Sequence, residues 1–191
     1  MSKLDQFERF EAKNRKEWHN WLQQNHLTSP GIWLIYYKKG SGKPTVSYDG
    51  AVEEALSFGW IDSKVNALDK ERYMQIFTPR KPGSIWSKLN KQRVEKLVND
   101  GLMMPAGLKK VESAKKDGSY YFLDDIEALI IPEDLKEALN ANELAKKHFE
   151  AFSDSVKKQI LYWIKTAKRP QTRKNRIEKT VILAAENKTP F

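Results

Sequence analysis

Every segment with strand character lies before residue 80, whereas from about Asp124 onward the chain shows helical patterns only. Residues 31–37 are rich in aromatic and β-branched side chains, which favours a buried strand. Residues 60–65 and 72–78 alternate in character on either side of a charged loop, which predicts two strands paired with each other. This division predicts an α+β fold, in which a small N-terminal part of mixed helices and strands packs with an all-helical C-terminal region.

We place the boundary so that residues 1–125 form the α+β domain and residues 126–191 the helical region. Asp49 is expected to cap the second helix, and Pro170 to close the helix that precedes the last one. The spacing of apolar residues predicts helices over residues 14–25, 49–57, 84–99, 105–117, 132–140, 142–151, 153–169 and 172–186.

The composition is typical of a soluble globular protein, with 40% hydrophobic and 31% charged residues in a chain of 191. No apolar run approaches the ~18 residues that a membrane span requires. Residues 1–18 are charged throughout and lack the apolar core of a secretory signal, so we expect a cytoplasmic protein. Cysteine is absent, which excludes disulfides, thiolate nucleophiles and thiolate metal sites.

The net charge of +9 is concentrated in two segments. Residues 64–96 hold nine Lys and Arg against three Asp and Glu, and residues 157–179 hold nine against one. Such segments on an otherwise mildly acidic chain indicate either a positive surface facing an anion or two solvated helix faces.

Several well-known catalytic patterns are missing from the chain. Residues 39–44 (KGSGKP) faintly resemble a phosphate-binding P-loop, but Pro44 replaces the hydroxyl residue that would hold magnesium. The three histidines show no metal-ligand spacing, and no GxSxG nucleophile elbow is present. The sequence therefore indicates no metal, no cofactor and no catalytic residue, and it leaves open whether the protein is an enzyme.

Asp62 stands out because aspartate is disfavoured inside a strand. Trp60 precedes it on the same predicted strand face, and Arg72 or Arg80 is the expected partner of its carboxylate. Two interpretations remain: a structural Asp–Arg pair, or a carboxylate that orients a ligand.

Residues 78–87 (TPRKPGSIWS) resemble an anion pocket. Two prolines fix the turn around the cations Arg80 and Lys81, and a helix N-terminus capped by Ser84 or Ser87 follows. Trp86 would cover a planar ligand or stack on Arg80. The alternative is an ordinary capped helix with a tryptophan in the core.

A second cationic cluster opens the last predicted helix. Arg173 and Arg176 lie three residues apart on that helix, so they can reach one anion together. We predict that this cluster closes on the first one, although a solvated basic helix end is the alternative.

Three stretches carry a family resemblance: YDGAVEEALSFGWIDSK (48–64), RYMQIFTPRKPGSIWSKLNKQRVEKL (72–97) and the tail 151–181 with its KRPQTR element. Together they resemble the bacterial YdeI/OmpD-associated, or bacteriocin-protection, family over nearly the whole chain. The resemblance implies an α+β N-terminal part, a helical C-terminal region and an association with tolerance to antimicrobial peptides. It supplies no catalytic residues.

We therefore expect a cytoplasmic stress- or resistance-associated protein that binds an anionic or aromatic small ligand in a basic cleft. The alternatives are a nucleic-acid-binding protein that uses the basic 157–179 face, and a protein-interaction module with an acidic partner. The predicted ligand-binding residues are Trp60, Asp62, Arg72, Thr78, Arg80, Ser84, Trp86, Ser87, Asn90, Arg173 and Arg176.

Overall fold

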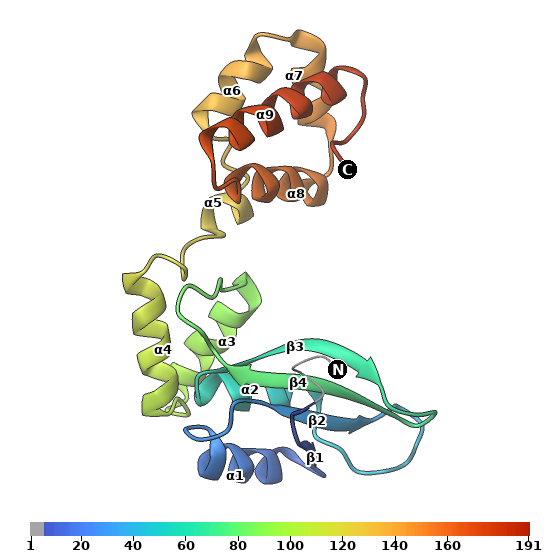
Figure 1. Cartoon of the computed structure of the whole chain (residues 1–191), viewed down its shortest axis with the longest axis vertical. Helices are drawn as coiled ribbons and strands as arrows, with labels where there is room; N and C mark the ends of the chain where they lie inside the picture. Colours follow the sequence, from blue (N-terminus) through green and yellow to red (C-terminus); the bar gives the residue numbers. More distant parts are fainter. Residues whose placement is uncertain (1–5) are drawn as a thin grey trace. The chain divides into compact units, whose positions relative to one another are not determined.

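The computed structural model of the chain describes residues 6–191, so the first five residues of the predicted N-terminal domain lie outside it. The chain forms two compact units, residues 1–121 and residues 122–191. The first unit contains a four-stranded sheet with helices, and the second shows helices only among its residues, which confirms the predicted α+β class (Figure 1). Within residues 6–191 no helix is both long enough and apolar enough to cross a membrane.

The sheet of the first unit has the strand order β1–β2–β4–β3. Strand β2 (Ile32–Tyr37) pairs antiparallel with β4 (Arg72–Pro79), which pairs antiparallel with β3 (Trp60–Ala67) as predicted. The edge strand β1 (Arg9–Glu11) runs parallel to β2 and was not predicted, because its three residues are too few to show alternation.

Four helices complete the first unit: α1 (Arg15–Asn25), α2 (Tyr48–Ser57), α3 (Lys88–Asn99) and α4 (Pro105–Lys116). The cap of α2 is Ser47, whose hydroxyl accepts a hydrogen bond from the Gly50 N–H, so the prediction of Asp49 as the cap was wrong. Asp49 instead lies in the first turn, where its charge suits the helix dipole. Of the two serines considered for α3, Ser87 is the cap.

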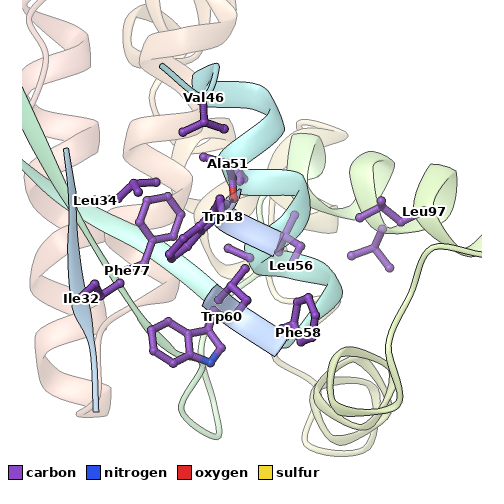
Figure 2. Packing of buried hydrophobic residues seen from close by; sticks show 14 of the residues in the cluster. Trp18, Ile32, Leu34, Val46, Ala51, Leu56, Phe58, Trp60, Phe77 and Leu97 are labelled. Carbon is purple, nitrogen blue, oxygen red and sulfur yellow. Dashed lines mark hydrogen bonds between the residues drawn. The ribbon is translucent and has the colours of Figure 1, made fainter. Parts of the chain in front are cut away.

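The two faces of the sheet bury different residues. The face covered by helices carries Leu34 and Phe77, against which Trp18 of α1 packs, and Figure 2 shows Trp18 and Phe77 beside each other. The opposite face buries a smaller cluster of Trp33, Ile35, Met74 and Ile76. Alternation along β2 and β4 thus supplies both clusters.

Helix α4 approaches the end of α2 unusually closely, and Gly107 makes this possible. A Cβ atom at Gly107 would lie 2.2 Å from the Ser57 carbonyl oxygen and 2.8 Å from that of Leu56. Gly59, just after α2, has a φ of +77° and also faces α4, where an added Cβ would meet Lys110 and Ala106. This contact sets the position of the later turns of α4 relative to the end of β4.

The second unit consists of α5 (Asp124–Glu127), α6 (Glu133–Asn140), α7 (Glu143–Ala151), α8 (Asp154–Lys165) and α9 (Pro170–Ala185). Its core includes Leu135, Phe149, Ile160 and Ile177. Pro170 occupies the first turn of α9, where its fixed φ suits a helix start. The prediction that Pro170 closes the preceding helix was therefore wrong, since α8 already ends at Lys165.

Candidate functional site

A small cavity of about 20 Å³ lies in the first unit where the segment after β4 faces α4. Its volume is comparable with the ~10–15 Å³ that one water molecule requires, so it admits a water or a single oxygen atom of a larger group. The lining residues are Arg80, Lys81, Pro82, Gly83, Ser84, Trp86, Lys110, Ser113, Ala114, Asp117 and Ser119.

The backbone of Arg80 is fixed from two sides. Its N–H donates a hydrogen bond of 2.9 Å to the Gly59 carbonyl, which continues the β3–β4 pairing by one residue. The ammonium group of Lys110 on α4 donates a bond of 2.7 Å to the Arg80 carbonyl oxygen. The side chain then lies over Trp86, with the guanidinium carbon 3.6 Å from the ring centroid. Arg80 and Trp86 therefore form a cation–π pair, as one of the two interpretations of Trp86 predicted.

The Arg80 side chain is buried without a counter-ion. Only 3% of the residue is exposed, its Nε has no hydrogen-bond partner, and no carboxylate of residues 6–191 lies within 4.0 Å of it. Burial lowers the pKa of Arg80 from its ordinary value to about 10, and the charge of Asp62 opposes part of that shift. The guanidinium thus remains a cation at neutral pH. Buried charges are normally paired with an opposite charge, and the Arg80 guanidinium lacks such a partner.

The remaining wall of the cavity is mainly positive. Lys81 and Lys110 add two cations, and Lys110 uses one of its three N–H donors on the Arg80 carbonyl. The single lining carboxylate, Asp117, accepts bonds from the N–H groups of Gly83 (3.0 Å) and Ser119 (2.9 Å). The hydrogen bonds from Ser119 and from the Gly83 N–H hold the pKa of Asp117 below its usual value. The cavity wall therefore contains three cations and one carboxylate, whose oxygens already accept hydrogen bonds from backbone N–H groups.

Asp62 lies in a second polar cluster on the helix-covered face of the sheet. Its Oδ2 accepts hydrogen bonds from Gln75 Nε2 (2.6 Å) and from the Tyr48 hydroxyl (3.2 Å). Neither of the partners expected for Asp62 forms an ion pair with it: Arg72 pairs with Asp69 at 2.7 Å and Arg80 lies beyond ion-pair distance. The predicted structural Asp–Arg pair is therefore absent.

The other predicted residues of the first unit have mainly structural surroundings. Trp60 is 1% exposed, and its indole N–H donates to the His26 carbonyl. Asn90 accepts a bond from Arg93, which also pairs with Asp49. Ser84 lines the cavity, Ser87 caps α3, and Thr78 lies in β4 against Gly31.

In the second unit, Arg173 and Arg176 are already bonded to neighbouring groups. Arg173 donates to both carboxylate oxygens of Asp134, at 2.6 and 2.9 Å. Arg176 donates to the Trp163 carbonyl and lies 5.1 Å from the Trp163 ring centroid. Their local role is thus to tie α9 to α6 and α8. The predicted meeting of this cluster with the first one stays a prediction.

Sequence reasoning missed the residues that α4 contributes. Lys110, Ser113 and Asp117 reach the cavity because Gly107 lets α4 approach α2 closely, and no chemical motif marks them. Gln75, which donates to Asp62, was likewise missed, because a strand pattern does not show which polar side chains are bonded to each other. The signal available in advance was the pair of glycines, at residues 59 and 107.

Fold and site together define an α+β protein whose first unit holds a buried arginine, without a counter-ion, at a small basic cavity. Residues 10–110 match a family described as "Domain of unknown function (DUF8412)", and residues 128–187 match the family described as "Bacteriocin-protection, YdeI or OmpD-Associated". The chain therefore belongs to the first family through more than half of its length, and its residues 128–187 match the YdeI/OmpD-associated family, which confirms the predicted resemblance for that segment. No curated protein and no solved structure matched the chain.

The two matches divide the stretches on which the resemblance rests. The tail 151–181 lies within the YdeI/OmpD-associated segment. The stretches 48–64 and 72–97, which contain Asp62 and Arg80, lie within the domain of unknown function. Arg80, Trp86 and Lys110 accordingly lie in the segment whose family description carries no function, and the remaining wall of the cavity follows it directly in the chain.

Proposed function

We propose that the first unit binds a small anionic ligand through Arg80. The observation that carries the proposal is the buried guanidinium without a counter-ion, beside a cavity that is lined by two further cations. A bound anion would supply the missing charge and accept hydrogen bonds from the guanidinium. Charge-assisted bonds of this kind are among the strongest in proteins, and the planar guanidinium suits carboxylate and phosphate oxygens equally.

The dimensions of the cavity narrow the ligand class. About 20 Å³ admits one oxygen atom but not a whole nucleotide or aromatic ring. The anionic group of the ligand would therefore insert one oxygen, while the rest of the molecule lies at the cavity mouth.

An aromatic ligand, the other class expected from the sequence, has less support. Trp86 is 1% exposed, with Arg80 on its ring and Tyr120 5.5 Å away between ring centroids. No ligand ring can stack on Trp86 unless one of these groups moves. We therefore propose an anionic ligand and assign Trp86 the role of holding the Arg80 side chain.

The alternative of nucleic-acid binding by residues 157–179 has weaker support. At least four of the nine cations there pair with carboxylates: Lys158 with Glu127, Lys165 with Asp125, Arg173 with Asp134 and Lys174 with Glu178. Each such pair reduces the charge that is available to neutralise phosphates. The link to bacteriocin protection likewise comes from the family description alone, and remains a proposal for this chain.

The test is thermal unfolding of the whole chain with increasing phosphate, sulfate or a short carboxylate, for the wild type and for Arg80→Met. Arg72→Met is the matched control, because Arg72 is a partly exposed arginine of the same strand region with its own carboxylate partner. Ligand at a hundred times its dissociation constant should stabilise the native state by about 2.7 kcal/mol. We expect saturable stabilisation of the wild type and of Arg72→Met, and none of Arg80→Met. Equal responses from all three proteins would refute the proposal.

A further inference from the structure

Two buried polar atoms near Asp62 have no hydrogen-bond partner among residues 6–191. They are the hydroxyl oxygen of Tyr36 and the Oε1 of Gln75, in residues that are 1% and 3% exposed. Strand register places both on the helix-covered face, because Gln75 lies opposite Leu34 and two residues from Phe77, the partner of Asp62. Native proteins rarely leave such atoms unsatisfied, so their common location requires an explanation.

The orientation of the Gln75 amide follows from the charge of Asp62. Its Nε2 donates to Asp62 Oδ2 at 2.6 Å, and a flipped amide would bring two oxygens together at that distance. Oε1 must therefore point away from Oδ2 as an acceptor. The Tyr48 hydroxyl shares Oδ2, whereas no hydrogen bond from residues 6–191 reaches Asp62 Oδ1. Two acceptors, one of them carrying a negative charge, are thus available in one cluster.

Arg80, which lines the cavity, lies close to this cluster along the sheet. It follows the β3–β4 pair directly after Pro79, which lies opposite Trp60, two residues before Asp62. The charges of Arg80 and Asp62 interact, yet the two side chains form no ion pair. A cation without a counter-ion and a carboxylate with one oxygen free of hydrogen bonds from residues 6–191 therefore lie toward the same end of the β3–β4 pair without forming an ion pair.

We propose that the ligand is a small zwitterion, whose anionic group binds Arg80 and whose ammonium group binds Asp62 and Gln75 Oε1. An ammonium group fits because it offers three donors and a positive charge to acceptors that are short of both. Tyr48 is 43% exposed and Asp62 is partly exposed, so the Asp62 carboxylate can be reached from solvent, whereas Gln75 lies behind it and is buried. This inference rests on the proposed function, because it requires the anionic end of the ligand at Arg80.

Two probes with the same anionic end separate the two proposals. O-Phosphoethanolamine carries an ammonium group, and ethyl phosphate carries none. Calorimetric titration into the whole chain should show the zwitterion binding roughly tenfold more tightly, the factor expected for a hydrogen bond between charged groups. Equal affinities would overturn the zwitterion inference and leave anion binding intact. Binding of neither probe would overturn both.

The variant Asp62→Asn tests the assignment of the ammonium subsite. It should remove the preference for O-phosphoethanolamine while ethyl phosphate binds as before. Asp69→Asn is the matched control, because this exposed carboxylate lies in the β3–β4 loop and pairs with Arg72. A preference that survives in Asp62→Asn would refute the assignment. If Asp62→Asn does not fold, the comparison of the two probes on the wild type still decides.

Discussion

Replacing Arg80 by methionine should stabilise the protein when no anion is present. The lowering of the Arg80 pKa from its ordinary value to about 10 corresponds to roughly 3 kcal/mol of unfavourable free energy for keeping the charge in the folded state. Methionine removes that charge and retains an unbranched apolar chain against Trp86. The substitution also loses the cation–π contact, which is worth about 0.5–2 kcal/mol.

The difference between the burial cost of the charge and the lost cation–π contact predicts that Arg80→Met raises the free energy of unfolding by about 1–2 kcal/mol. This agrees with replacements of buried ionic groups by apolar ones. The assay is urea unfolding at pH 7 in a buffer free of phosphate and sulfate. Tryptophan fluorescence suits it, because five of the six tryptophans belong to the first unit. Arg72→Met, at a solvent-exposed ion pair, should leave stability nearly unchanged or slightly lower. A loss of stability in Arg80→Met larger than in the control would refute the reasoning.

Three further predictions follow from the same structure. The free energy of unfolding of Arg80→Met should exceed that of the wild type by less as pH rises through about 10, because the folded wild type then loses a proton that the unfolded chain still holds. A difference in free energy of unfolding that stays constant up to pH 11 in paired urea titrations would contradict this. Gly107→Ala should lower the free energy of unfolding by about 1–3 kcal/mol, because the added methyl group meets the Ser57 carbonyl. It should also weaken the stabilisation by anions. Unchanged anion binding would show that the close approach of α4 does not form the cavity. The Arg173 guanidinium holds the pKa of Asp134 below its usual value, so Asp134→Asn should destabilise the second unit at pH 7. In thermal unfolding, this loss of stability relative to the wild type should vanish as pH falls through the folded-state pKa of Asp134. A loss that does not depend on pH would point to packing instead.

Elements with a strong periodic pattern were predictable from the sequence. Helix α1 and the strand pair β3–β4 follow from the spacing of Trp18 and Leu22 and from alternation across the charged loop. The sequence was less informative where more apolar residues fit the helical spacing than the helix buries. On α3, the apolar residues Leu89 and Val98 fit the same helical spacing as Val94 and Leu97, yet they are 53% and 48% exposed, because α3 buries only the stripe that contains Val94 and Leu97.

The site was predictable only in the part that one continuous segment supplies. The TPRKPGSIW segment pointed to Arg80 and Trp86, because cations between prolines before a helix start are visible in a single stretch. Lys110 and Asp117 come from another element, and a backbone contact at Gly107 sets their position. The missing counter-ion of Arg80 was not predictable either, since Asp62 was an equally plausible partner until its bonds to Gln75 and Tyr48 were known.

The most direct test of the central claim is the NMR signal of the Arg80 Nε–H, assigned by its absence in Arg80→Met. This buried donor has no partner among residues 6–191 and belongs to the proposed anion site, so it should report an anion more directly than any global property. We predict that the signal shifts saturably as phosphate is added to the wild-type chain at constant ionic strength, while the other arginine Nε–H signals stay largely unchanged. An Arg80 signal that does not move, or that moves in parallel with those of exposed arginines such as Arg169, would contradict the account.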